Sequence, residues 1–246
     1  MQTKLYVIPG SHPSMTARLM LEYKGIPYKR IDLISALHKP FLRALRFRGD
    51  TVPALRIDGR RIQGTRDISR ALDHIPPGPA LFPADPERRA AVEEAERWGD
   101  EVLQPVPRRL AWWAMRRDRS DVESFLEGAR LGIPIWLAAR TARPIIWISA
   151  RLNSADDDAA HDDLVKLSGL LDKVDGWIGE GLVGGEELNA ADFQIATSVR
   201  LLMCFEDLRP AVERRPAGML AMRVCPRFPG HIGPVLRPDE RSTAPA

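Results

Sequence analysis

A short polar motif near the N-terminus has the residue types and the setting to bind an anion. Ser11 and His12 follow an apolar segment at residues 3–8 and a Pro-Gly break, and they precede helical apolar spacing over residues 15–24. The amino end of a helix favours an anion, because its backbone N–H groups and the helix dipole point there. The Ser11 hydroxyl could donate to that anion, or it could serve only as a helix N-cap. His12 could add positive charge or a hydrogen bond, or it could be a solvated loop residue.

A second group of polar residues surrounds a proline further along the chain. Residues 51–57 have the composition of a strand with a proline near its start, and Asp58-Gly59 predicts a hairpin turn to a returning strand at residues 60–63. Gly64-Thr65 then opens a helix that runs to about residue 73. This pattern places the Thr65 hydroxyl at a helix N-terminus, where it would suit a carboxylate.

The elements that carry these motifs divide the chain into four parts. Residues 1–76 have the predicted order β-α-β-α-β-β-α, which indicates a mixed four-stranded sheet with helices on both faces. Residues 77–86 belong to a proline-rich linker, residues 87–225 are helical almost throughout with a break at Pro105 and Pro107, and residues 226–246 form a tail.

Composition narrows the class of protein. The 246 residues are 44% hydrophobic and 28% charged, which is typical of a globular fold. Two cysteines are too few for a disulfide scaffold, and neither a signal peptide nor a membrane-spanning run is recognisable. We therefore expect a cytoplasmic protein with no membrane partner.

The net charge is +3 overall, but residues 1–80 carry +8 and the remainder −5. This asymmetry indicates either a solvated basic face or attraction of a small anion, and no nucleic acid is expected because stacking aromatics are not interleaved with the arginines.

The order and spacing of several short pieces resemble the glutathione transferase superfamily. The pieces are Leu5–Ser11, Arg18–Tyr28, Val52–Leu55, the hairpin and helix through Thr65 and Ile68, and Ala80–Pro83. The resemblance implies an α/β thioredoxin-like N-terminal domain followed by an all-α helical-bundle domain. It also implies glutathione as co-substrate, no metal, and a homodimer.

The resemblance gives the polar residues specific roles. Ser11 corresponds to the catalytic position of the serine-type classes, where a hydroxyl stabilises the glutathione thiolate. Lowering a free thiol pKa of about 8.5 by one to two units would take roughly 1.4–3 kcal/mol. Val52 corresponds to the residue that pairs with the cysteinyl backbone, and Pro53 to a cis proline, with a plain turn as the alternative. The segment before residue 204 contains no cysteine, which argues against the branches that form mixed disulfides.

Around the rest of the peptide site the correspondence is incomplete. Thr65 retains the hydroxyl expected to meet the γ-glutamyl carboxylate, and Gln63 could also reach the ligand. Gly64 replaces the usual acidic residue. Asp67 could compensate for its loss, or it could simply favour the first turn of the helix. Lys39 lies where a basic residue often meets the glycyl carboxylate, although it could equally be solvated.

The helical part supplies a predicted substrate wall and a predicted cap. Arg108, Trp112 and Trp113 would flank the cleft for a hydrophobic substrate, unless the tryptophans belong to the helix core. Asn189 and Asp192 resemble the capping element of a buried helix in the family's second domain.

The sequence leaves several functions open. The first is an enzyme that uses the glutathione thiolate to attack a small hydrophobic electrophile. The alternatives are a glutathione-dependent isomerase or ether-cleaving enzyme, a non-catalytic ligand-binding or interaction protein, and a related enzyme that uses another small thiol.

Overall fold

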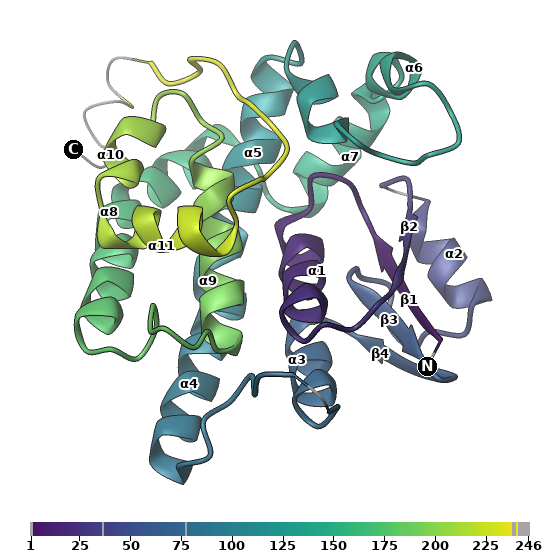
Figure 1. Ribbon diagram of the computed structural model, residues 1–246. Coiled ribbons are helices and arrows are strands. Elements are labelled where there is room, and N and C mark those ends of the chain that lie inside the picture. The colour runs from purple at the N-terminus through teal and green to yellow at the C-terminus, as the bar shows by residue number, and fades with distance from the viewer. Residues whose placement is uncertain (1, 36, 77, 238–239, 241–246) are drawn as a thin grey trace.

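The N-terminal domain combines a small sheet with three helices. A computed structural model describes residues 2–35, 37–76, 78–237 and 240. Figure 1 shows the sheet with α1 and α3 on the side that meets the helical region and α2 on the other side. The elements are β1 (Thr3–Val7), α1 (His12–Tyr23), β2 (Lys29–Asp32), α2 (His38–Ala44), β3 (Ala54–Ile57), β4 (Arg60–Gln63) and α3 (Thr65–Asp73). The predicted order of elements is confirmed.

The sheet is mixed, with strand order β2-β1-β3-β4. Strand β1 runs parallel to β2 and antiparallel to β3, and β3 is antiparallel to β4. Successive side chains of β1 alternate between two apolar layers, as the period of a strand requires. Leu5 and Val7 join the large core under α1 and α3, whereas Tyr6 packs with Leu42 and Phe47 under α2.

The strand register brings the candidate loops to one end of the sheet. Val7 lies opposite Asp32, and Tyr6 lies opposite Ala54. Ala54 in turn lies opposite Gln63. The carboxyl ends of β1, β2 and β4 and the amino end of β3 therefore meet at the same edge. The segments that follow or precede them, around residues 8–12, 51–53 and 64–65, converge there.

The rest of the chain is helical. Its elements are α4 (Pro86–Trp98), the π-helical turn η1 (Gly99–Leu103), α5 (Pro105–Arg117), the 3₁₀ turn η2 (Val122–Leu126), α6 (Ile135–Arg140), α7 (Arg143–Leu152), α8 (Asp157–Gly179), α9 (Ala190–Leu202), α10 (Arg209–Glu213) and α11 (Pro216–Val224). The break predicted at the prolines is the turn η1. Pro105 has no N–H for the Glu101 carbonyl, so the α-helical ladder cannot continue unchanged.

Helix α9 lies at the centre of the helical domain, and every one of its residues is buried. Its start has the predicted capping box. The Asn189 side chain accepts from the backbone N–H of Asp192, and the Asp192 carboxylate accepts from the backbone N–H of Asn189 at 2.8 Å. A second carboxylate oxygen accepts from the Gly184 N–H at 2.6 Å, so Asp192 holds the preceding loop as well.

The predicted tail is partly docked rather than free. In Figure 1 the last described segment, in yellow, passes beside α5. Ile232 forms a β-bridge with Phe205, and the His231 N–H donates to the Ser124 hydroxyl at 2.8 Å. We call residues 226–236 the C-terminal strap. The last tail residues, 238–239 and 241–246, lie outside the described residues.

Candidate functional site

Ser11 caps helix α1 and keeps a proton to donate. Its Oγ accepts from the Ser14 N–H at 3.4 Å, which is the N-cap interaction. A serine hydroxyl has one donor and two acceptor sites, so the cap leaves its O–H available. No partner for that O–H lies among the residues that the structure describes. The two sequence readings of Ser11, N-cap and hydrogen-bond donor, are therefore compatible.

The Ser11 hydroxyl borders a cavity of about 30 Å³ between the domains. Arg18 and Arg30 line this cavity together with Asp32, whose buried carboxylate pairs with Arg30 at 2.7 Å. The positive end of α1 favours an anion here, whereas the Arg18 guanidinium already lies 3.8 Å from a Glu22 carboxylate oxygen and Glu127 also lines the cavity. The volume corresponds to a few water molecules, which is enough for a thiol group and too small for an added organic substrate.

His12 does not face this cavity, which corrects the expectation of a loop histidine beside the anion. The His12 ring is buried, and its Nε2 donates to the Gln104 carbonyl at 3.2 Å. Burial, with the nearby Arg108 cation, lowers the pKa of His12 to about 3. A neutral ring adds no positive charge. The helical spacing of His12, Thr16 and Met20, all buried, is the signal that would have placed it on the face toward the helical domain.

Val52 and Pro53 are joined by a cis peptide bond, as the resemblance predicted. Gln63 supports the segment before them. Its side-chain oxygen accepts from the Gly49 N–H at 2.8 Å, and its side-chain nitrogen donates to the Thr51 carbonyl at 2.6 Å. Both polar atoms of Gln63 thus hold the loop before the cis proline, and a direct contact of Gln63 with the ligand stays a prediction.

The backbone conformation at position 64 explains why a glycine is present there. Gly64 has φ +89°, a left-handed conformation that favours glycine, and its N–H donates to the Pro53 carbonyl at 3.0 Å. Thr65 follows as the first residue of α3 and is buried, while Asp67 is exposed. The chain therefore has a glycine in place of the acidic residue at a turn whose backbone hydrogen bond joins the start of α3 to the Val52–Pro53 segment.

Lys39 is close to this loop but is not a free cation. Its Nζ lies 3.3 Å from a carboxylate oxygen of Asp50, and the same oxygen is 3.5 Å from an Arg43 nitrogen. All three side chains are partly exposed, so this is a surface ion pair. Such pairs exchange partners at little cost, about 0–1 kcal/mol, and Lys39 remains able to meet a carboxylate.

The predicted substrate wall is wrong for Trp113. Its ring is buried in the helical core, its Nε1 donates to Asp157 at 2.7 Å, and the Arg117 guanidinium lies 4.0 Å from the ring centroid. Trp112 is half-buried against the same core. Arg108 lies close enough to His12 and Asp100 to shift their pKa values, and burial lowers its own pKa. The placement of Arg108 and Trp112 beside a substrate cleft stays a prediction.

Sequence reasoning missed the side chains that cover Ser11. Phe228 and Pro229 of the C-terminal strap line the cavity. Phe125 of η2 packs onto Gly10, where an added Cβ would lie 3.0 Å from the Phe125 carbonyl oxygen. Gly230 of the C-terminal strap also packs against the Phe125 ring, and sequence periodicity does not connect residues 10, 125 and 230, which lie far apart in the chain.

Across the described ranges, no group of three or more His, Cys, Asp or Glu side chains is arranged to hold a metal ion. None of the helices that the structure describes combines the length and the apolar composition needed to cross a membrane.

Comparison with known proteins identifies the fold. Residues 5–80 match the family model described as glutathione S-transferase, N-terminal domain. FzlA from C. crescentus has a TM-score of 0.60 at 17% identity, covering 92% of this chain and 89% of its own. A glutathione S-transferase from Methylobacillus flagellatus, solved with glutathione bound, has a TM-score of 0.57 at 17% identity and covers 100% of both chains.

The β-etherase LigF from a Sphingobium strain has a TM-score of 0.51 at 20% identity, covering 91% of this chain and 99% of its own. No curated protein sequence matches the chain. At these identities the solved structures show the shared fold, a thioredoxin-like domain followed by a helical domain.

Proposed function

We propose that this chain, whose N-terminal domain belongs to the glutathione S-transferase family, binds glutathione and uses the Ser11 hydroxyl to stabilise its thiolate. The observation that carries the proposal is the free Ser11 O–H at the amino end of α1, on a cavity that also contains Arg18. The thiolate would attack a small hydrophobic electrophile.

Ionising the bound thiol requires only a modest stabilisation of the thiolate by the site. A free thiol has a pKa of about 8.5, so under a tenth is ionised at pH 7.4. A shift of about 1.5 units, worth roughly 2 kcal/mol, would ionise more than half. The thiol proton passes to solvent, the sulfur forms a bond to the electrophilic carbon, and the leaving group departs with the electron pair.

The remaining loops suit the peptide part of glutathione. Val52 lies just before β3, at the end of the sheet where the candidate loops converge, and we propose that its backbone pairs with the cysteinyl backbone of glutathione. The Thr65 hydroxyl and the free N–H groups of α3 suit one carboxylate, and Lys39 suits the other. The predicted homodimer and cytoplasmic location stay predictions.

A non-catalytic binding protein is the second candidate. Two observations favour it, the small cavity covered by the C-terminal strap and the loss of the acidic side chain at Gly64. Because one structural neighbour is a β-etherase, ether cleavage remains a reaction to be tested, and so does isomerisation, which the sequence also leaves open.

Turnover of 1-chloro-2,4-dinitrobenzene with glutathione separates these candidates. We expect Ser11→Ala and Ser11→Gly to lower kcat/KM by about ten- to a hundredfold, the range that one to two pKa units allow. Glycine serves as an N-cap almost as well as serine, so Ser11→Gly separates loss of the hydroxyl from loss of the cap. Ser168→Ala, on α8, is the control and should leave kcat/KM unchanged.

Calorimetric titration with glutathione completes the test. Binding without turnover of aromatic halides or aryl ethers would favour the non-catalytic candidate. Turnover that is equal in the wild type and both Ser11 variants would overturn the role of the hydroxyl.

A further inference from the structure

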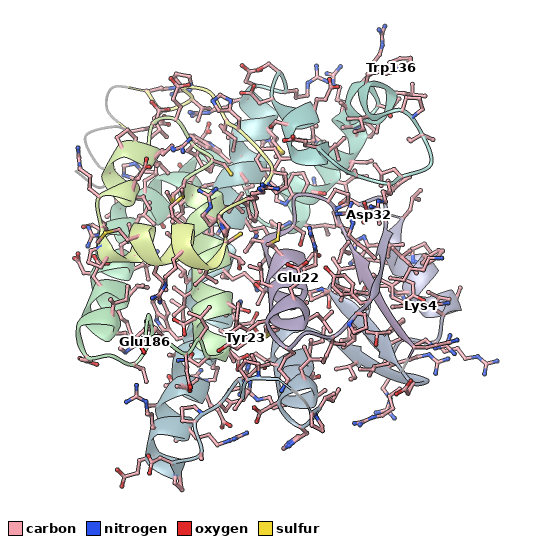
Figure 2. The ribbon with its side chains drawn as sticks, in the orientation of Figure 1. Lys4, Glu22, Tyr23, Asp32, Trp136 and Glu186 are labelled. Carbon is pink, nitrogen blue, oxygen red and sulfur yellow. The ribbon has the colours of Figure 1, made fainter. Side chains whose placement is uncertain are left out.

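Helices α6 and α7 present large apolar side chains to solvent. Six of the eleven exposed large hydrophobic residues of the described chain lie between residues 133 and 152, on α6 and α7 and just before α6. They are Ile133, Trp136, Leu137, Trp147, Ile148 and Leu152, and we call them the α6–α7 face. Trp136 and Trp147 are each 59% exposed. Figure 2 shows Trp136 on the outer edge of the molecule, beyond the ribbon of α6.

These residues are not part of the core. Helix α6 buries none of its residues, and α7 turns Ile146, Ser149 and Ala150 inward. The outward residues of α7 recur at helical spacing, with Trp147 and Ile148 one turn before Leu152. A contiguous apolar patch on the solvent side of a helix indicates a surface that another protein or a membrane covers.

The charge of the segment restricts which partner can bind the α6–α7 face. Residues 128–155 contain no Asp or Glu and four arginines, at positions 130, 140, 143 and 151. None of the four has a carboxylate within ion-pair distance among the described residues. The Arg151 guanidinium lies 5.8 Å from the centroid of the Trp147 ring, so cationic and aromatic groups share the face.

We propose that the α6–α7 face docks onto an anionic lipid surface. Segments that lie in the headgroup region combine tryptophans, whose rings contact acyl chains, with arginines, whose guanidinium groups contact phosphate. A symmetric contact between two copies of the face would place arginines against arginines with no carboxylate in the segment. This departs from the sequence expectation of no membrane partner.

The tie between this segment and the first domain gives the docked protein a fixed orientation. Arg30 of β2 donates to the Gly128 carbonyl at 2.5 Å, and the Arg130 N–H donates to the Asp32 carboxylate at 2.7 Å. These two bonds anchor residues 128–130, which directly precede the face, to β2.

Vesicle flotation of the full chain tests the proposal. We use vesicles of phosphatidylcholine alone and vesicles with about a quarter phosphatidylserine. We expect the wild type to float with the anionic vesicles and to be released as salt is raised, because each surface arginine contributes about fivefold to partitioning. Removing three arginines by Arg140→Gln, Arg143→Gln and Arg151→Gln should then lower partitioning about a hundredfold.

A second variant and two matched controls isolate the apolar contribution. Trp136→Ser with Trp147→Ser should lower partitioning at least tenfold. The controls are Val165→Ser with Met219→Ser, which removes exposed apolar residues elsewhere, and the triple change Arg119→Gln, Arg214→Gln and Arg227→Gln, which removes the same charge. Both controls should float like the wild type.

Three outcomes would overturn the proposal. The first is equal flotation with neutral and anionic vesicles, or none with either. The second is an equal loss in the controls. The third is a tryptophan variant that floats normally but changes from dimer to monomer by sedimentation, which would make the face an interface between copies.

Discussion

Lowering the pH from 7.5 to 5 should destabilise the fold by about 2 kcal/mol through His12 alone. His12 is buried between the first turn of α1 and the start of α5, with its Nε2 donating to the Gln104 carbonyl. Burial and the Arg108 cation both disfavour the imidazolium form there. In the unfolded chain the same ring titrates with an ordinary pKa of 6.5.

The sign follows from the direction of the shift. The pKa of His12 falls from 6.5 to about 3 on folding, so between these values the unfolded state binds more protons. The stability is therefore present above pH 6.5 and is lost as the pH falls toward 3. At pH 5 the solution is about 1.5 units below the unfolded pKa, and each unit corresponds to about 1.36 kcal/mol.

Urea unfolding of the wild type and His12→Gln at both pH values measures this term. Glutamine does not titrate, and its amide can still donate to the Gln104 carbonyl. Burial also lowers the pKa of His38 and raises that of Glu96, but those contributions are common to both proteins and cancel in the difference. With a denaturant slope of about 3 kcal/mol/M, the extra shift of the wild-type midpoint is about 0.7 M.

The exposed His161 provides the control, because His161→Gln should reproduce the wild-type dependence on pH. An equal loss of stability in the wild type and His12→Gln would refute the reasoning. It would mean that the pKa of His12 does not fall on folding, so that the buried ring accepts a proton at pH 5 in the folded protein.

Three further predictions concern stability and reactivity. Asp192→Ala removes the acceptor of two short backbone hydrogen bonds in the core and should cost about 3 kcal/mol, seen as a lower Tm; an unchanged Tm would contradict it. Gly64→Ala should destabilise the fold by about 1–2 kcal/mol, because φ at this position is +89°. Gly169→Ala in α8 should stabilise it by about 0.5–1 kcal/mol, because no atom lies within 4 Å of the new Cβ. Changes in the free energy of unfolding that have the same sign in both variants would refute the comparison. Burial raises the pKa of Cys204 to about 12 and of Cys225 to about 11, so an aromatic disulfide reagent at pH 8 should label neither thiol until urea is added.

Local pattern was sufficient for the first domain and for the helix cap. The hairpin at Asp58-Gly59 and the strand at residues 60–63 were predicted at their observed bounds, since turn chemistry acts over a few residues. The capping box at Asn189 was predictable for the same reason, because both partners lie within one helical turn.

Contacts between distant segments were not predictable in this way. The sequence leaves both a substrate wall and the helix core open for Trp113, because a tryptophan on a helix has the same sequence signature in a core and in a cleft. The burial of its ring and the hydrogen bond from its indole N–H to Asp157 place it in the core. The cover over Ser11 comes from Phe228, more than two hundred residues away, and no periodicity connects the two.

The charge asymmetry shows how register redirects an inference from composition. The +8 charge of residues 1–80 suggested attraction of an anion to the site, yet Lys29, Lys4, Arg56 and Arg61 lie in one row across all four strands. Because paired residues share a face and Tyr6 of β1 packs toward α2, this row points to the α2 side and not to the sheet end. Its long-range field falls off over about 8 Å at physiological salt. The local donors at the sheet end, Ser11 and Arg18 among them, must therefore select the anion, while the distant row contributes to its approach.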